Sequence, residues 1–457
     1  MFFGSRIKKI IKSLARSRLM KDKFVVTGTG DALFVADIPE EYFNGDFKEV
    51  KDYLDGCDIK MTNLETNISE FGSYPNSFSG GTWLNTEPKV FDDLTKFGFN
   101  YYGTANNHCM DYGYYGMLST IDELDKRGLA HSGTGRSLEE ASAPAIVDVA
   151  GKKSAIIAVN CEYSSVQAGA RAGKANDVMK GRPGVNYFRH DEYLTVDEND
   201  LKVLKEIAKK TGVNAEEERS VAGGFSLPEP DGIFTFGGVK VCYDGSKKST
   251  ECNKADKQRV IDSIKQAKEQ NDYVFVLIHC HDSAVTENAI PPAYYEELAR
   301  ACIDAGASAI IGGGTHELRP IEIYNGKPIF YSLGDFIYQG MRVKYLPVDF
   351  LEKYGCDKNA TAWEGLMARS KNNTIGLQVH KCNFMTVLPK IVYQGEKVVS
   401  IEMMPVVAGF KKSGKLDGLP YFAKGEESEE IFAVLTRLST PYGTKIIKDG
   451  DMFRIEL

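Results

Sequence analysis

The sequence predicts an α/β fold, and three features of the chain indicate it. Short apolar runs of strand length recur, each ending at a glycine or a polar residue: 24–28, 57–62, 99–103, 155–159, 273–278 and 308–311. Between them lie stretches with apolar residues at helical spacing, for example 88–97 and 117–124. Polar side chains follow the runs directly, where strand ends converge in an α/β sheet. With 42% hydrophobic and 26% charged residues, the 457-residue chain can bury a full-sized core.

The predicted helices are placed by their start and stop residues. Pro88 begins one helix, and Gly98 ends it before the strand at 99–103. Gly128 ends the next helix, and a capping box of Ser and Glu at 137 and 140 begins a short one. Later helices are expected over about 254–270, 292–304 and 427–437, with a hairpin turn at 325–326.

The chain is expected to form one main domain over residues 24–410. It carries an insertion at about 164–250 and a C-terminal extension, 411–457, packed on the same domain. The insertion is polar and rich in glycine, which is typical of a loop-rich lid. Residues 1–23 carry eight Lys or Arg and one Asp, with apolar residues at helical spacing between them. They form either a basic amphipathic helix on an anionic membrane surface or a mobile basic tail.

Composition argues against several classes of function. A net charge of -7 and a pI near 5.7 are unlike those of a nucleic-acid-binding protein. No apolar run reaches transmembrane length, and charges interrupt the N-terminal apolar stretches, so we expect no secretory signal. The nine cysteines include no CxxC pair, which is typical of free thiols in a reducing compartment. We expect the protein in the cytoplasm or peripherally on the inner membrane face.

Three histidines follow predicted strands. His279 and His281 stand at i and i+2, so both imidazoles lie on one face, and such a pair suits Zn, Fe or Mn better than Mg or Ca. His316 follows the glycines at 312–314, which let a loop turn tightly and a metal or anion approach the backbone. An isolated histidine pair is better explained as hydrogen-bonded loop residues, so the metal hypothesis depends on His316 joining it.

Oxygen ligands follow other strands. Asn107, His108 and Asp111 offer a neutral oxygen, an imidazole and a carboxylate that can orient that imidazole, although the asparagine also suits a helix cap. Asp31 and Glu65 come just past two strands. A carboxylate can bridge two metal ions roughly 3.5–4 Å apart, yet each carboxylate taken alone equally suits a cap or a surface charge.

These motifs, in this order, resemble the bacterial CapA family of capsule, or poly-γ-glutamate, synthesis proteins. The resemblance runs from about residue 24 to 410, and its most specific segments are 104–113 and 331–336. It implies a four-layer α/β/β/α sandwich of the calcineurin-like metallophosphatase type. It also implies that Asp31, Glu65, Asn107, His279 (or His281) and His316 bind metal at the strand ends. His108, with Asp111 and His281, is then expected to act in catalysis.

The sequence departs from the family pattern at several positions. Metallophosphatases usually carry a histidine two residues after the first Asp, where Leu33 stands. Gly313 replaces the first histidine of a Gly-His-x-Pro-His loop, so we expect one or two metal ions, with Asp335 or water filling in at an altered second position. Arg319 stands where Gln is frequent, and we expect it to hold a substrate carboxylate as a bidentate fork. Asp335 is grouped with Arg319 as a substrate-binding residue.

The preferred hypothesis is a metal-dependent hydrolase that needs a divalent Mn, Zn or Fe ion. It would act on an amide- or ester-linked, carboxylate-rich polymer or its precursor, with His108 donating a proton to the leaving group. Two alternatives stay open: a polymer-binding or assembly component with a degenerate metal site, anchored by residues 1–23, and a metal-assisted epimerase. The expected partners are the anionic polymer and a membrane surface, with no nucleic acid.

Overall fold

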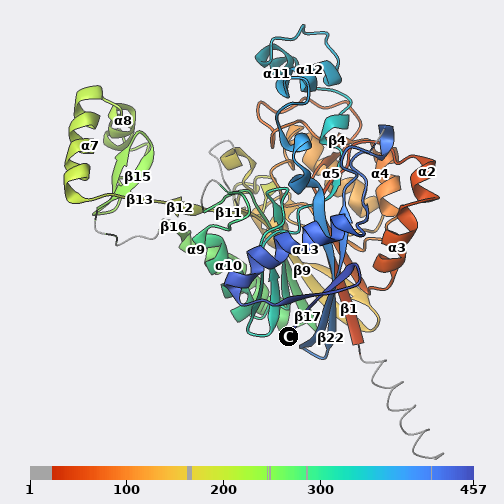
Figure 1. Cartoon of the computed structure of the whole chain (residues 1–457). Coiled ribbons are helices and arrows are strands. Elements are labelled where there is room, and N and C mark those ends of the chain that lie inside the picture. The colour runs from red at the N-terminus through yellow and green to blue at the C-terminus, as the bar shows by residue number, and fades with distance from the viewer. Residues whose placement is uncertain (1–22, 162–166, 244, 246–248, 285–286, 413) are drawn as a thin grey trace, which may run out of the picture.

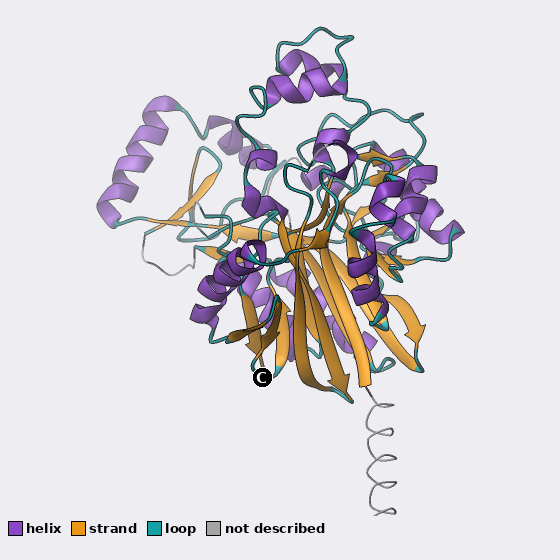
Figure 2. Cartoon of the chain, turned by 45° about the vertical axis from the view of Figure 1, so that its right-hand side comes forward, coloured by secondary structure: helices purple, strands orange, loops and turns teal. Residues whose placement is uncertain are grey.

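The computed structural model describes residues 23–161, 167–243, 245, 249–284, 287–412 and 414–457. The basic segment predicted at the N-terminus lies outside the described residues, apart from Lys23, which begins the first strand. Two large β-sheets form the body of the protein, and helices lie outside them (Figures 1 and 2). The α/β class predicted from the sequence is therefore confirmed.

The first sheet has ten strands in the order β25-β26-β23-β22-β1-β2-β5-β6, with β21 beside β1 and β24 beside β23. Strands β1, β2, β5 and β6 run parallel, whereas β22 pairs antiparallel with β1. The strands are β1 (Lys23–Leu33), β2 (Ile59–Leu64), β5 (Tyr101–Gly103), β6 (Ala130–Ser132), β21 (Asp335–Tyr338), β22 (Met385–Gln394), β23 (Lys397–Val407), β24 (Tyr421–Phe422), β25 (Ile446–Asp449) and β26 (Met452–Ile455).

The second sheet has seven strands in the order β11-β9-β17-β18-β20-β19, with β8 beside β9. Its centre is parallel, because β17 pairs in parallel with both β9 and β18. The strands are β8 (Ala145–Val149), β9 (Lys152–Cys161), β11 (Tyr187–Phe188), β17 (Tyr273–Cys280), β18 (Ala309–Gly314), β19 (Ile321–Tyr324) and β20 (Lys327–Phe330).

The main core lies between the two sheets. Alternate residues of β17 divide between two clusters: Phe275 and Leu277 join Val26 and Met61 of the first sheet, and Val276 faces the other way. Helices α9 (Lys254–Lys268) and α10 (Ala293–Asp304) cover the outer face of the second sheet. Helices α3 (Phe47–Asp55), α4 (Pro88–Thr95) and α5 (Gly113–Lys126) cover the outer face of the first. The layers thus run helix, sheet, sheet, helix (Figure 2).

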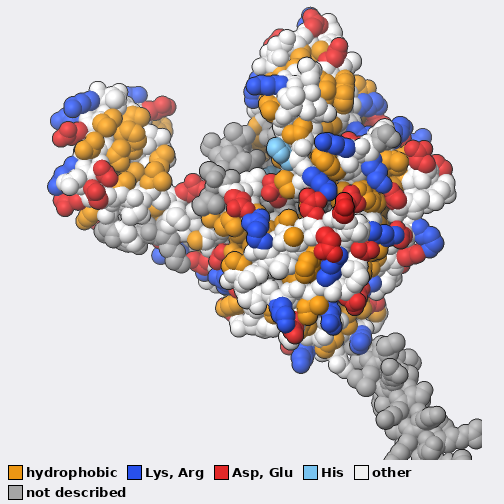
Figure 3. Space-filling model, in the orientation of Figure 1, with side chains coloured by type: hydrophobic (Ala, Val, Ile, Leu, Met, Phe, Trp, Pro, Cys, Tyr) orange, Lys and Arg blue, Asp and Glu red, His pale blue; other side chains and the backbone are white. Residues whose placement is uncertain are grey.

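The insertion has more regular structure than its composition predicted. It holds the sheet β13 (Leu194–Thr195), β15 (Val239–Cys242) and β14 (Phe234–Phe236) with α7 (Glu198–Thr211) and α8 (Ala215–Ala222). This unit projects from the body beyond β12 (His190–Glu192) and β16 (Thr250–Cys252) (Figure 1). Apolar side chains gather on it, and Phe225 and Leu227 are among the exposed ones (Figure 3). The glycine-rich pattern gave no signal for these short strands.

The C-terminal extension continues the first sheet. Strands β24 and β26 pair with β23, and α13 (Glu426–Ser439) packs beside them. The described part of the chain contains no helix that is both long and apolar enough to cross a membrane. Above the strand ends, α11 (Val348–Lys353) and α12 (Ala362–Arg369) form a cap (Figure 1).

The end of β1 passes very close to the turn before β21. The amide of Asp31 donates to the carbonyl of Gly334 at 2.9 Å, and the register sets Asp31 opposite Asp335. A Cβ on Gly30 would lie 1.7 Å from the same carbonyl oxygen, so only glycine fits there. This close approach brings two acidic side chains from opposite ends of the sequence together.

We predict that Gly30→Ala lowers the free energy of unfolding by about 3 kcal/mol, because the backbone must move to admit the methyl group. Denaturant midpoints at a fixed pH measure the change. Gly72→Ala is the matched control, since a Cβ at Gly72 meets nothing within 4 Å. Equal midpoints for the two variants would contradict the packing described here.

Candidate metal centre

The polar residues singled out in the sequence meet at the carboxyl ends of the central strands. Asp31 lies near the end of β1, Glu65 directly follows β2, and His279 lies near the end of β17. The other contributors are Asn107 and His108 in the turn after β5, His281 after β17, His316 after β18 and Asp335 at the start of β21. Every one of these side chains except His281, which is partly buried, is buried.

One group of potential ligand atoms combines nitrogen and oxygen. Glu65, His279 and His281 each offer an atom within 4.8 Å of the others. His279 Nε2 lies 3.5 Å from Glu65 Oε1, 3.2 Å from His281 Nε2 and 2.8 Å from Asn107 Oδ1. The Nδ2 of Asn107 donates to the carbonyl of Gly80, which turns its oxygen toward His279.

A second group, rich in carboxylates, adjoins the first. Asp31, Glu65, His316 and Asp335 offer atoms within 4.8 Å of one another. His316 Nδ1 lies 2.9 Å from Asp335 Oδ1. The backbone amide of Gly314 donates to Asp31 Oδ2 at 2.6 Å, which fixes the orientation of that carboxylate. Glu65 belongs to both groups, as a ligand that bridges two ions would.

The carboxylate of Glu65 is the strongest single indication of a cation-binding site. Its side chain is fully buried, and neither oxygen has a hydrogen-bond partner among the residues that the structure describes. Asp335 Oδ2 is also buried and has no hydrogen-bond partner among the described residues. Burying a carboxylate without a hydrogen-bond donor is costly, and a divalent ion between the two groups would offset that cost. The donor set fits a pair of metal ions that share Glu65.

The acid–base properties of the groups follow from burial and from neighbouring charges. Burial, with the charges of Asp31 and Asp335, raises the pKa of Glu65 well above its ordinary value. Burial also raises the pKa of Asp335 to about 6, although His316 opposes the shift. Burial, with nearby histidines, lowers the pKa of His281 well below its ordinary value, which favours the neutral imidazole that binds metals.

His108 and Asp111 form a pair beside the metal groups. His108 Nδ1–H donates to Asp111 Oδ2 at 2.6 Å, and His108 Nε2 lies 3.9 Å from Glu65 Oε1. Asp111 is held in turn by the backbone amides of Gly80 and Leu84 at 3.0 and 2.8 Å. These contacts fix the imidazole with Nε2 directed at the site. The pairing of these two residues agrees with the orienting role that the sequence predicted for the carboxylate.

Two asparagines that the sequence analysis did not assign hold the ligands in place. Asn63 Nδ2 donates to Asp31 Oδ1 at 2.7 Å and lies 3.2 Å from His279 Nδ1. Asn106 Nδ2 donates to Asn63 Oδ1 at 3.1 Å. The signal for Asn63 was its place two residues before Glu65, at the end of β2. His316 adds a further feature that no pattern revealed, a backbone φ of 60°, which is unusual outside glycine.

The structure corrects the role predicted for Arg319. This side chain is fully buried, and its guanidinium donates to the carbonyls of Asn288, Cys280 and Asp282 and to the hydroxyl of Ser283. Arg319 therefore stabilises the loop after β17, and its guanidinium is not available to bind a substrate carboxylate. Substrate binding by Asp335 is likewise disfavoured, because this buried carboxylate pairs with His316 inside the second ligand group.

The missing histidine of the glycine loop also has a physical reason. A Cβ on Gly313 would lie 2.3 Å from Asp31 Oδ1, so no side chain fits at this position. His281 offers an imidazole to the same half of the site as His279. Leu33, where a histidine was expected, lines the cavity above the site. Asp335, on the strand next to β1, joins Asp31 in the second ligand group.

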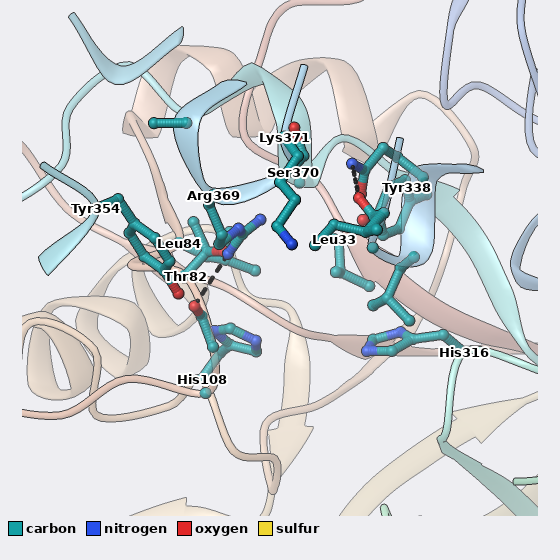
Figure 4. Close-up of a pocket in the computed structure, with 18 residues that line it drawn as sticks. Leu33, Thr82, Leu84, His108, His316, Tyr338, Tyr354, Arg369, Ser370 and Lys371 are labelled. Atoms are coloured by element: carbon teal, nitrogen blue, oxygen red, sulfur yellow. Dashed lines mark hydrogen bonds between the residues drawn. The ribbon is translucent and has the colours of Figure 1, made fainter. Parts of the chain in front are cut away.

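A cavity of about 570 Å³ is lined by His108 and by His316 of the second ligand group (Figure 4). His108 and His316 lie at its floor on opposite sides, and the cap around α12 forms its roof. The size suits a small-molecule ligand or a short stretch of polymer. Of the candidate ligands, His316 lines this cavity directly, and His108 lines it on the other side, so a substrate lying there would contact both imidazoles.

Removing the Glu65 charge should stabilise the metal-free protein. We predict that Glu65→Gln in chelator raises the free energy of unfolding by about 1–3 kcal/mol, because a buried carboxylate without a hydrogen-bond donor is lost. We expect Mn²⁺ to raise the melting temperature of the wild type and not that of this variant. Glu70→Gln, at an exposed position nearby, is the control. A destabilised Glu65→Gln protein that still responds to Mn²⁺ would refute the bridging role.

Asp335 should make the metal-free protein depend on pH. Its raised pKa means that the folded protein binds a proton more readily than the unfolded chain, so its contribution is present below pH 4 and is lost as pH rises through about 6. We predict that the stability of the wild type relative to Asp335→Asn falls by roughly 2–3 kcal/mol between pH 4 and 7 in chelator. Denaturant unfolding of both proteins at several pH values measures this. A stability of the wild type relative to Asp335→Asn that stays constant or rises with pH would contradict the prediction.

Comparison with known proteins places this site in a family. Residues 25–340 match the sequence model described as bacterial capsule synthesis protein PGA_cap. The uncharacterized protein y4sH of Sinorhizobium fredii is 28% identical over 440 residues, which is 93% of this chain and 91% of that protein. The PGA biosynthesis protein CapA of Bacillus subtilis is 27% identical over 64% of this chain and 56% of its own length. A probable polyglutamine synthesis accessory protein of Mycobacterium tuberculosis is 25% identical, over 62% and 57%. The chain therefore belongs to the bacterial capsule synthesis family PGA_cap.

Proposed function

We propose that this protein is a metal-dependent hydrolase that cleaves an amide or ester bond in a carboxylate-rich polymer or its precursor. The observation that carries the proposal is the buried carboxylate of Glu65, shared by two groups of ligand atoms and without a hydrogen-bond partner in the described part of the chain. A pair of ions at such a site, when bound, supplies Lewis acidity and lowers the pKa of water.

The two halves of the site differ in their donors. Glu65, Asn107, His279 and His281 would hold one ion, and Asp31, Glu65, His316 and Asp335 the other. Imidazole nitrogens together with carboxylate oxygens suit Mn, Fe or Zn better than Mg or Ca. The carboxylate-rich half favours a harder ion than the histidine-rich half.

His108 is placed to move a proton. Asp111 accepts from its Nδ1–H, so Nε2, which points to the cavity floor, is the atom that can donate a proton to a leaving group. Asp111 cannot turn away, because two backbone amides hold it. Asn63 and Asn106 hold the ligands and take no part in proton transfer.

The family supports the substrate class, since the relatives compared above are described by PGA biosynthesis and by polyglutamine synthesis, and the family itself by capsule synthesis. A second candidate function is suggested by the word accessory in the name of one relative. In that case the protein would bind the polymer or its precursor at the same cavity without cleaving it. The two candidates differ in turnover, and both need the cavity.

The experiment combines metal content with turnover. Protein purified without chelator is analysed by mass spectrometry for metals and is incubated with γ-linked glutamate oligomers and with nitrophenyl esters. We predict two ions per chain, and a kcat for His108→Asn at least about 100-fold below that of the wild type with metal content unchanged. His131→Asn, at a histidine that pairs with Asp125 outside the site, is the control.

Different failures separate the candidates. Metal-loaded protein that binds the oligomers without turnover would favour the binding function. Unchanged turnover in His108→Asn would exclude the proton donor named here. Full turnover in protein stripped of metal would overturn the proposal as a whole.

A further inference from the structure

The roof of the cavity comes from a segment outside the family match. That match ends at residue 340, whereas much of the cavity is lined by residues from 354 to 378. Its floor, with His108 and His316, lies within the match. The roof of the cavity is therefore supplied by residues that lie beyond the family match.

The roof carries positive charge into the cavity. Of the described residues that line it, Arg369 and Lys371 are cationic and none is acidic. Figure 4 shows the side chain of Lys371 reaching down into the space between His108 and His316, with the guanidinium of Arg369 beside it. Lys371 is an exposed residue at the edge of this cavity, and its ammonium has no ion-pair partner among the residues the structure describes. An anion in the cavity would supply one.

The segment that presents these cations is held rigidly. Arg369 Nη1 donates to Thr82 Oγ1 at 2.6 Å, and its guanidinium lies over the Phe350 ring. Lys371 and the two following residues all have left-handed backbones, with φ of 47°, 56° and 62°. Ser370 is buried, and its backbone carbonyl stabilises this turn by accepting hydrogen bonds from the amides of Thr374 and Ile375. Such a run of non-glycine residues is costly and occurs where the surrounding structure requires it, often at ligand sites.

Apolar side chains separate the cations from part of the floor. The walls include Leu33, Leu84, Tyr338 and Leu377. A ligand that fits this lining has an aliphatic stem with an anionic group at the roof and a polar, metal-seeking group at the floor. Glutamate-like units, with carboxylates on short methylene chains, have this form.

We infer that Lys371 and Arg369 are specificity-determining residues that bind a carboxylate of the substrate while the reacting bond lies at the floor. The orientation of that bond rests on the proposed function, but carboxylate binding at the roof does not. The role expected of Arg319 from the sequence thus falls to two residues of the cap.

The test compares two small molecules of the same shape and different charge. Adipate and adipamide are titrated into the protein by calorimetry at low salt, in the metal-loaded form and again in chelator. We expect adipate to bind wild type at least about tenfold more tightly than adipamide, since a hydrogen bond to a charged group is worth about that factor. Lys371→Met should remove most of the difference, Lys371→Arg should retain it, and Lys358→Met, at an exposed lysine of the same segment, should leave it unchanged.

Chelator distinguishes the roof from direct binding to metal at the floor. In Lys371→Met, the preference for adipate over adipamide should be lost both in the metal-loaded protein and in chelator. Added salt should weaken adipate binding to the wild type more than to this variant. Arg369→Met gives a second reading, checked for folding by its melting temperature. Equal affinities of wild type for adipate and adipamide, or equal behaviour of Lys371→Met and Lys358→Met, would overturn the inference. Loss of turnover with this discrimination intact would count against the hydrolase alone.

Discussion

Three carboxylates buried within a few ångströms of one another are the constraint on which the rest of this site depends. Asp31, Glu65 and Asp335 repel each other and have lost water, and Glu65 has no donor to satisfy it in the described chain. Like charges at such separations in a low dielectric cannot all stay ionised without cations. The pKa values of Glu65 and Asp335 rise accordingly, whereas that of Asp31 lies below its ordinary value, because His279, His316 and the Gly314 amide outweigh the effect of burial. These buried groups could therefore hold divalent ions, which would offset the repulsion among the carboxylates.

The surrounding structure maintains this arrangement at points of very close approach. Gly30 against Gly334 sets Asp31 beside Asp335, and Gly313 leaves room for the Asp31 carboxylate. Asn63 donates a hydrogen bond to the ligand Asp31, and Asp111 accepts one from the imidazole of His108. The two-sheet core beneath supplies the rigidity that such a site needs, because its central strands are buried on both faces.

Much of this site could be predicted from the sequence, because strand ends converge in an α/β fold wherever they lie in the chain. The apolar runs before Asp31, Glu65 and His279 were sufficient for that, and the family pattern gave the order of the ligands. The error at Arg319 arose because a motif position says nothing about burial. Its guanidinium binds carbonyls of a loop that is distant in sequence.

The remaining features lie in contacts that no local pattern contains. The roof of the cavity arises from residues near 370; two of its three left-handed residues are asparagines, which favour a turn, but nothing local predicts that this turn lies over the strand ends. The pairing of Asp31 with Asp335 joins residues about 300 positions apart, through a register that only the folded sheet defines. The strands of the insertion were missed because they are short and lie among glycines.

The central claim is that Glu65 bridges two ions, and electron paramagnetic resonance of the protein loaded with two equivalents of Mn²⁺ tests it most directly. Two ions that share a carboxylate roughly 3.5–4 Å apart should give an exchange-coupled spectrum. Glu65→Gln should then show only the six-line signal of isolated Mn²⁺. An isolated signal from the wild type at full loading, or coupling that survives in Glu65→Gln, would contradict the account.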